Sequence, residues 1–402
     1  MMNRIKFFIL FFILTIAGIL SSLILLELMF NLFMPQKTFK NLYTDIKQCW
    51  INDEQVPFTL EANCQMEMKS NEFTAFTTIN SLGYRGSMVE LPKPKDVKRI
   101  IITGDSFIFG WGVEDTNTVS KRLEDLVSKE QIFEKNKVEV INAGFMGGLS
   151  PDGHLINLRK MLERGYNPDI VIMSVFVYND ISDMAKNEWV GTWDYSIPNK
   201  VRSRDLFVTE DNQLIHRKLK SFYKNPIFMN SNIVAILSRN QGLIEILNKV
   251  KSPTESESSY NVQDDCIFDE TCEERTLVFS KLNSVMESAQ QLTKGKPGSD
   301  VELLVLIIPA DFQIYQDAVK KYGGENASLG IRQAYKIEFP QPQKAIKKFL
   351  DQEGIEYLDL LSAFRQNSYP RKFFIEDGHW NEFGHQLAAE EIVKWIEKTK
   401  NF

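Results

Sequence analysis

Histidine and cysteine are both scarce in this chain of 402 residues, which has 4 of each. So few histidines can supply few metal ligands, and no neighbouring pair of cysteines has the Cys-x-x-Cys spacing of a zinc site. A Gly-x-x-x-x-Gly-Lys-Ser/Thr phosphate loop and the dinucleotide-binding glycine spacing are also missing. Positive charge is not in excess, since the net charge is -6. We therefore expect no metal, no nucleotide cofactor and no nucleic-acid partner.

What is present is an ordinary globular balance, 43% hydrophobic and 25% charged, with one exception at the N-terminus. Residues 7–26 form an uncharged run that follows Arg4 and Lys6. Twenty helical residues rise about 30 Å, which matches the hydrocarbon core of a bilayer. A secretory signal has a shorter apolar region and a cleavage site of small residues, and the small residues here lie deep in the run. We favour an uncleaved anchor over residues 1–34, embedded through residues 7–29, with a cleaved signal as the alternative.

The cysteines bear on the compartment. Cys49 and Cys64 lie close in sequence, as do Cys266 and Cys272. Two local pairs suit two small-loop disulfides in an oxidising compartment, although three connectivities are possible. Four buried free thiols are the alternative. Basic residues lie on both sides of the apolar run and indicate its orientation only weakly. We expect the main part of the chain to be extracytoplasmic.

From residue 97 onward, apolar runs alternate with amphipathic stretches. Runs that suit buried strands cover residues 99–103, 138–142, 170–177, 301–308 and 355–360. Helical patterns cover residues 118–129, 151–164, 275–292, 341–352 and 382–398. This alternation predicts an α/β domain over residues 97–398, with a parallel sheet covered on both faces and a site beyond the carboxyl ends of its strands.

Two segments do not share this alternation. Residues 35–96 contain four of the prolines and no long periodic run, and we interpret them as an extracytoplasmic lead-in packed on the main domain. Residues 183–275 form a long insertion between the third and fourth strands, with a helical pattern at 233–250. The insertion is predicted to form a lid or one wall of a substrate cleft, and a helical buttress without substrate contact is the alternative.

A serine follows the first predicted strand in the sequence Gly-Asp-Ser-Phe at residues 104–107. Small residues at the end of a strand allow a sharp turn, and Ser106 can then point out over the sheet. A hydroxyl becomes a useful nucleophile when a base and an oxyanion site are close by. A serine that caps the next helix is the alternative. Asp105 is interpreted as steadying the turn.

Two candidate oxyanion donors follow the next two strands. Gly144 has no Cβ, so its backbone N–H can approach a bound oxyanion, although a plain turn glycine is the alternative. Asn179 carries an uncharged side-chain amide that can donate to the same oxygen.

A histidine stands just before the last predicted helix, in Asp-Gly-His-Trp-Asn at residues 377–381. An imidazole titrates near neutral pH, so His379 is the candidate general base. Asp377 is our choice for the acid that orients it, and Glu376 is the rival. Asn381 is a candidate cap for the last helix, and His385 is assigned a structural role.

Together, these blocks resemble the SGNH/GDSL hydrolase family over about residues 97–398. The order is Gly-Asp-Ser-Phe at 104–107, Asn-x-Gly at 142–144, Asn-Asp at 179–180 and Asp-Gly-His at 377–379. The chain also looks like the membrane-anchored bacterial branch, whose members carry one N-terminal span, an Asn/Gly/Arg segment before the serine (here 80–86) and Gly-Trp-Gly-Val soon after it (here 110–113).

The resemblance implies a flavodoxin-like α/β/α sandwich with a five-stranded, mainly parallel sheet and an open site. It implies Ser106 as nucleophile, His379 as base and Asp377 as orienting acid. It also implies an oxyanion hole made by the Ser106 and Gly144 N–H groups with the Asn179 side chain. Several relatives act on O-acetyl groups of exported polysaccharide or cell-wall glycan. The resemblance to the membrane-anchored branch also implies a single-pass protein of the bacterial cell membrane.

The chain departs from the family pattern twice. The third block usually begins with glycine, but Val177 stands there. The last block is often Asp-x-x-His, whereas this chain has Asp-x-His, which resembles the Asp-x-His-Trp pattern of alginate O-acetylation proteins.

Three functions follow from these residues. The first is an O-acyl ester hydrolase, acetyl being the favoured acyl group, that acts on carbohydrate or lipid esters. The second is an O-acyltransferase that uses the same residues to modify an exported polysaccharide, with a membrane-bound partner as acyl donor. The third is a non-catalytic glycan-binding module that has kept the fold.

Overall fold

The computed structural model describes residues 2–35, 49–133, 136–146, 149–191, 198–203, 206–208, 214–216, 226–238, 267–269, 272–294, 301–336 and 342–399. The chain divides into two compact units, one made of Met1–Lys47 and Ile215–Ser259, the other of Gln48–Leu214 and Tyr260–Phe402. Each unit is made of two separate segments, whereas the sequence predicts three consecutive parts, namely an anchor, a lead-in and a hydrolase domain. The predicted domain boundaries stay a prediction.

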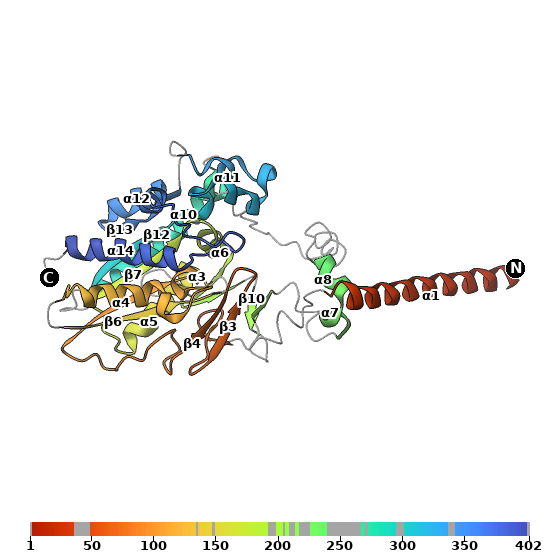
Figure 1. Cartoon of the computed structure of the whole chain (residues 1–402), viewed down its shortest axis with the longest axis horizontal. Helices are drawn as coiled ribbons and strands as arrows, with labels where there is room; N and C mark the ends of the chain where they lie inside the picture. The colour runs from red at the N-terminus through yellow and green to blue at the C-terminus, as the bar shows by residue number, and fades with distance from the viewer. Residues whose placement is uncertain are drawn as a thin grey trace. The chain divides into compact units, whose positions relative to one another are not determined.

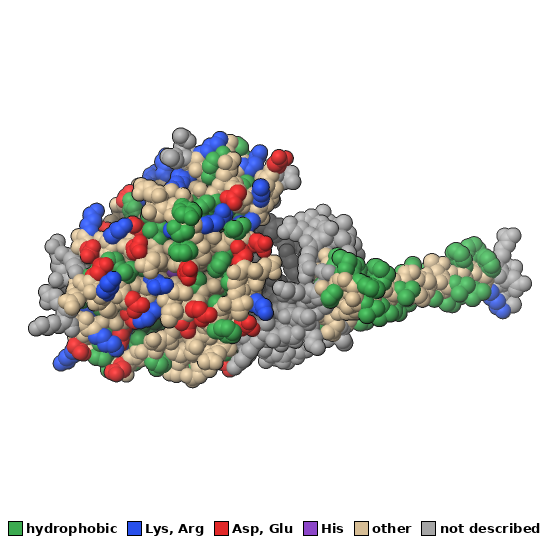
Figure 2. Space-filling view, in the orientation of Figure 1, with side chains coloured by type: hydrophobic (Ala, Val, Ile, Leu, Met, Phe, Trp, Pro, Cys, Tyr) green, Lys and Arg blue, Asp and Glu red, His purple; other side chains and the backbone are tan. Residues whose placement is uncertain are grey.

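The first unit contains the long apolar helix α1 (Met2–Phe33). Residues Lys6–Phe33, which contain an 18-residue window with a mean hydropathy of 2.8, are long enough to cross a membrane. This confirms the predicted candidate span and extends it at its C-terminal end. Apolar side chains cover its visible face (Figure 2). Two short helices of the insertion, α7 (Pro226–Asn230) and α8 (Asn232–Ser238), belong to the same unit. Residues 239–250 of the predicted helix lie outside the described residues.

Helix α8 is held against α1 by one carboxylate. Glu27 on α1 accepts hydrogen bonds from the Ser231 hydroxyl (2.7 Å) and from the backbone N–H groups of Asn232 (2.6 Å) and Ile233 (3.1 Å). The carboxylate therefore satisfies donors at the beginning of a helix that have no partner within it.

The second unit is built on a five-stranded sheet (Figure 1). All neighbouring strands run parallel, in the order β13-β12-β7-β5-β6. Their bounds are β5 (Val97–Gly104), β6 (Lys137–Gly144), β7 (Ile170–Phe176), β12 (Glu302–Ile308) and β13 (Glu356–Asp359). The first strand of the sheet in sequence thus lies between the second and third, which is the flavodoxin-like order.

Helices flank this sheet on both sides (Figure 1). Helix α14 packs on α4, whereas α10 packs on α5, α6 and α12. The longer helices are α4 (Val119–Lys129), α5 (Pro151–Glu163), α6 (Asn179–Lys186), α10 (Glu274–Lys294), α12 (Pro342–Glu353) and α14 (Glu382–Thr399). The shorter ones are α3 (Ser106–Phe109), α11 (Leu329–Gln333) and α13 (Leu361–Gln366). The predicted fold class is confirmed, and the five predicted strands and five predicted helices end within two residues of the observed bounds.

The described part of the lead-in contains two antiparallel strand pairs. Strand β1 (Trp50–Ile51) pairs with β2 (Thr59–Leu60), and β3 (Gln65–Lys69) pairs with β4 (Thr74–Thr78), both antiparallel. Cys49 and Cys64 form a disulfide, as predicted. Cys272 is also disulfide-bonded, whereas Cys266 lies outside the described residues.

The described part of the insertion carries strands as well as helices. Within the second unit, β8 (Glu188–Val190) pairs antiparallel with β9 (Lys200–Arg202). Strands β10 (Leu206–Val208) and β11 (Leu214–His216) follow. The predicted lid or substrate wall stays a prediction.

A buried ion pair ties strand β5 to its neighbour β6. Arg99 on β5 is fully buried and contacts Glu139 on β6 at 2.7 Å. Its guanidinium also donates to the carbonyl oxygens of Tyr166 (2.8 Å) and Glu90 (2.8 Å). Because Glu139 and Tyr166 are buried with it, removal of the guanidinium leaves a buried carboxylate and a buried carbonyl with fewer donors.

We therefore expect Arg99→Met to lower the free energy of unfolding by about 3–5 kcal/mol. Lys98→Met, at the neighbouring and more exposed Lys98–Asp169 pair, should cost less than about 1 kcal/mol. Denaturant titration of the purified full-length protein measures both values. Similar losses for the two variants would contradict the importance of the buried pair.

Candidate active site

The candidate nucleophile stands at the first position of a short helix. Strand β5 ends at Gly104, and Ser106 begins α3 directly afterwards. Asp105 caps this helix, because its carboxylate accepts from the Phe107 N–H at 3.1 Å. The alternative in which Ser106 is the cap therefore does not apply, and Asp105 steadies the turn as expected.

Three side chains form a hydrogen-bonded chain at this point. The Ser106 Oγ lies 2.7 Å from His379 Nε2, and His379 Nδ1 lies 2.5 Å from Asp377 Oδ1. A carboxylate only accepts hydrogen bonds, so Nδ1 carries the proton and Nε2 is left to accept from the serine hydroxyl. This is the arrangement that a general base needs to take a proton from an attacking hydroxyl.

The structure brings Asp377, rather than Glu376, to the imidazole. The second Asp377 oxygen accepts from Trp111 Nε1 at 3.0 Å. Glu376 instead accepts from the side-chain amide of Asn71 at 3.3 Å. Burial raises the pKa of Asp377, but the hydrogen bond and charge of His379 and the bond from Trp111 outweigh it and hold that pKa below its usual value. Asp377 is therefore ionised where an orienting acid must be.

A glycine allows the acid and the base to stand two residues apart. Gly378 has a φ of 91°, which L side chains rarely adopt. A Cβ at this position would lie 2.8 Å from Lys321 Nζ. Asn381 then caps α14, as expected, because its side-chain oxygen accepts from the N–H groups of Phe383 (3.0 Å) and Gly384 (3.2 Å).

The two candidate oxyanion donors have partners of their own. The Gly144 N–H donates to Asn142 Oδ1 at 3.0 Å, and a Cβ on Gly144 would lie 2.2 Å from the Phe109 nitrogen. The glycine is thus required by the close approach of α3, whereas its role as an oxyanion donor stays a prediction that would require this hydrogen bond to break. Asn179, half-buried at the start of α6, donates its amide to Asp183 at 3.2 Å.

Val177, which departs from the family pattern, is fully buried, and its N–H donates to the Ile308 carbonyl at 3.1 Å. The valine therefore belongs to the core beyond the end of β7. His385 is also buried, accepts from the Val119 N–H at 3.2 Å and has a pKa lowered to about 3 by burial, in line with a structural role.

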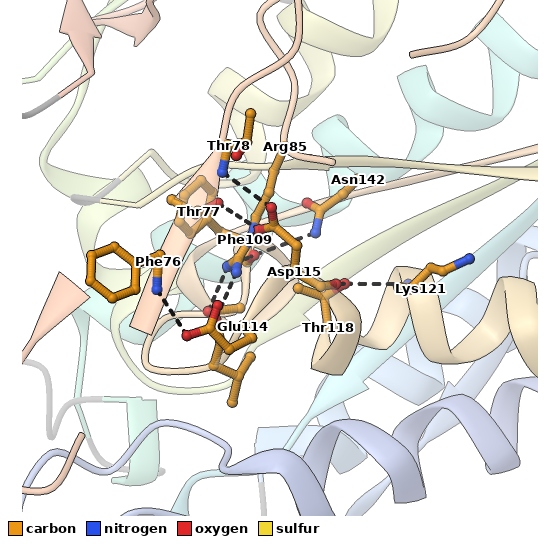
Figure 3. A network of polar contacts seen from close by, with 12 residues as sticks. Phe76, Thr77, Thr78, Arg85, Phe109, Glu114, Asp115, Thr118, Lys121 and Asn142 are labelled. Atoms are coloured by element: carbon orange, nitrogen blue, oxygen red, sulfur yellow. Dashed lines mark hydrogen bonds and ion pairs between the residues drawn. The ribbon is translucent and has the colours of Figure 1, made fainter. Parts of the chain in front are cut away.

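Arg85 fixes the other end of the short serine helix, a role that the sequence reasoning did not assign (Figure 3). Its buried guanidinium donates to the carbonyl oxygens of Phe109, Gly110 and Val113 at 2.6–2.7 Å. Its Nε contacts Asp115 at 2.7 Å. Carbonyls at the end of a helix need such donors, so Arg85 holds the segment that begins with Ser106. The one sequence feature that could have pointed to this role is the arginine of the Asn/Gly/Arg segment at residues 80–86, which is Arg85.

Two buried carboxyl groups lie beneath the site. Asp105 is buried, and burial raises its pKa to about 6, although the charge of His379 acts in the opposite direction. Asp180 is buried as well, and burial followed by the charge of Asp105 raises its pKa above the usual value. Among the described residues, no group of three or more His, Cys, Asp or Glu side chains is arranged to hold a metal ion.

Comparison with known proteins finds a family model that matches the C-terminal third of the chain. Residues 273–402 match the family described as "SGNH hydrolase-like domain, acetyltransferase AlgX", and the matched part contains Asp377 and His379. No curated protein matches the chain.

Solved structures also match. One is a lipolytic protein of the G-D-S-L family from Veillonella parvula, with 12% identity, a TM-score of 0.35 and coverage of 74% of this chain and 97% of the other. A lipase/acylhydrolase from Enterococcus faecalis has 13% identity, a TM-score of 0.36 and coverage of 75% and 96%. A two-domain esterase active on acetylated mannans has 11% identity, a TM-score of 0.38 and coverage of 76% and 50%. At these TM-scores, the likenesses carry no conclusion about this chain.

The raised pKa of Asp105 predicts a pH-dependent stability. The folded protein holds this proton up to about pH 6, whereas an unfolded aspartate loses it near pH 3.9, so the contribution of this group to stability falls as pH rises from about 4 to 6. Asp105→Asn keeps an oxygen for the Phe107 N–H and removes the charge. We expect a higher melting temperature than wild type at pH 7.5 and a smaller difference at pH 4.5.

The exposed Asp96→Asn serves as the matched control and should show no such change with pH. The raised pKa of Asp105 would be contradicted if the melting temperatures of Asp105→Asn and wild type differed by the same amount at the two pH values.

Proposed function

We propose that this chain, whose residues 273–402 match an SGNH hydrolase-like domain, is an extracytoplasmic serine-dependent ester hydrolase of the SGNH/GDSL family that acts on O-acyl groups, in particular acetyl groups. The substrates are esters of carbohydrates or lipids. The observation that carries this proposal is the hydrogen-bonded chain from Ser106 Oγ through His379 to Asp377.

The reaction follows from these contacts. The Ser106 Oγ attacks the carbonyl carbon of the ester while His379 Nε2 takes its proton. The same proton then passes to the departing sugar or lipid oxygen, which leaves the acyl group on Ser106. Water then attacks the acyl carbon while His379 takes its proton; the bond from that carbon to Ser106 Oγ breaks, His379 returns the proton to Oγ, and the carboxylic acid is released. Asp377 stabilises the imidazolium that forms in both half-reactions.

The oxyanion needs donors in the same place. The Ser106 N–H lies in the first turn of α3, where a backbone N–H has no acceptor within the helix. It is therefore the first donor in the proposal, together with the Asn179 side chain and the Gly144 N–H. To bind the oxyanion, the Asn179 amide would break its hydrogen bond to Asp183, and the Gly144 N–H would break its hydrogen bond to Asn142.

The location outside the cytoplasm is supported by two features. Helix α1 is long and apolar enough to span a membrane, and Cys49–Cys64 is a disulfide, which is typical of oxidising compartments. We propose a single-pass protein of the bacterial cell membrane.

A second candidate is an O-acyltransferase, which the acetyltransferase in the description of the matched family favours. Both reactions share the acyl-enzyme. They differ in whether water or a sugar hydroxyl accepts the acyl group. If the insertion at residues 183–275 excludes water from the acyl-enzyme, transfer to a sugar is favoured over hydrolysis.

The test is covalent labelling of the full-length protein with a fluorophosphonate, followed by identification of the modified peptide by mass spectrometry. We expect an adduct on Ser106 in wild type and none in Ser106→Ala. Asp377→Asn should slow labelling by about 10²–10⁴-fold. Glu376→Gln, the matched control, should leave the rate unchanged.

Equal labelling of wild type and Ser106→Ala would contradict the proposal and favour a glycan-binding module. For a protein that is labelled, release of acetate from an acetylated glycan without an acceptor indicates a hydrolase. Appearance of acetyl groups on an added sugar acceptor indicates a transferase.

A further inference from the structure

One carboxylate of the lead-in holds the loop that carries Asp377. Glu72 lies in the turn between β3 and β4, about three hundred residues before that loop. Its Oε1 accepts from the Ile375 N–H at 2.6 Å, and its Oε2 accepts from the N–H groups of Glu376 and Asp377, each at 2.8 Å. Three consecutive backbone donors thus converge on one side chain.

Such a contact is stronger than an ordinary loop hydrogen bond. A carboxylate that accepts backbone N–H groups forms short, charge-assisted bonds. Because one of the three donors is the backbone of Asp377 itself, Glu72 fixes the point from which the Asp377 side chain reaches His379. A small displacement there would lengthen the 2.5 Å contact to His379 Nδ1.

The neighbours of Glu72 hold the same loop from a second direction. The Phe73 ring packs against Phe374 at 4.8 Å and against Trp111 at 5.6 Å between ring centroids. Trp111 in turn donates to the second oxygen of Asp377 at 3.0 Å. The second oxygen of the acid and its backbone N–H are therefore set by Trp111 and Glu72, which contact or belong to the turn at residues 70–73.

The same hairpin also reaches the serine side of the site. Thr77 and Thr78 on β4 donate to the carboxylate of Asp115 at 2.8 and 3.1 Å, and Asp115 pairs with Arg85 (Figure 3). Arg85 holds the carbonyls at the end of α3. One hairpin thus connects the segment of the nucleophile with the segment of the base and acid.

We propose that Glu72 is a positioning residue that sets the orientation of Asp377 and His379, so that the lead-in completes the catalytic unit. This inference rests on the proposed function, because it assigns Glu72 to the same site. Its contacts are all with the backbone of the loop, so Glu72 acts through Asp377 and affects the chemical step more than the binding of substrate.

The test is Glu72→Gln in the full-length protein, with the fluorophosphonate as probe. The NH2 group that replaces one carboxylate oxygen cannot accept a hydrogen bond, so at least one of the three contacts is lost. We expect the maximal labelling rate of Ser106 to fall by about 10- to 100-fold. The probe concentration for half-maximal rate should stay unchanged. Glu67→Gln, on strand β3 of the same hairpin, is the matched control and should label like wild type.

A double-mutant cycle separates positioning from a general structural role. In the Asp377→Asn background, Glu72→Gln should have little further effect, because the residue through which it acts has already been changed. The positioning role would be overturned if Glu72→Gln lowered the labelling rate equally in both backgrounds. It would also be overturned if the loss of rate were accompanied by a lower melting temperature that accounts for it.

The two proposals fail in different ways. If wild type is labelled at Ser106 and Glu72→Gln is labelled at the same rate, the positioning role is wrong and the proposed function stands. If wild type is not labelled at Ser106 at all, both are wrong.

Discussion

The hydrogen bond between Ser106 Oγ and His379 Nε2 joins segments that are 273 residues apart, and the rest of the site depends on it. Neither side chain can act alone, since the hydroxyl needs a base and the base needs a fixed tautomer. Each partner is therefore held from its own side. Asp105 and Arg85 fix the short helix of the serine, whereas Gly378 and Asn381 fix the loop of the histidine.

The order of the strands explains why these segments meet. Strand β5 lies between β6 and β7, so the strand order reverses its direction across the sheet at β5, and sites in such sheets form beyond the carboxyl ends of the strands at this point. Ser106 begins immediately after β5, and Asn179 follows β7. The loop before α14 contacts Ser106 from one side and is itself held by the turn between β3 and β4. The lead-in is in this sense part of the site rather than an appendage to it.

The sequence predicts the regular part of this arrangement well, because buried strands and amphipathic helices leave periodic patterns. Ser106, His379 and Asp377 could also be predicted, since each stands at the end of such an element. The sequence favours Asp377 over Glu376 but leaves Glu376 as a rival, because both precede the histidine within reach. In the structure Asp377 contacts the imidazole, whereas Glu376 accepts from Asn71. Arg85 and Glu72 act through backbone groups far along the chain, and such contacts leave no periodic signal. The hydrogen bond from the Gly144 N–H to the Asn142 side chain is local, but it depends on a side-chain orientation that leaves no periodic signal either.

The most direct measurement of the central claim is the imidazole proton of His379, observed by NMR on full-length protein with isotope-labelled histidine. With only 4 histidines, the ring signals can be assigned by single substitutions. The account predicts a strongly downfield proton on His379 Nδ1 that is lost in Asp377→Asn and kept in Glu376→Gln. A His379 ring that carries its proton on Nε2, or a downfield signal that survives Asp377→Asn, would contradict it.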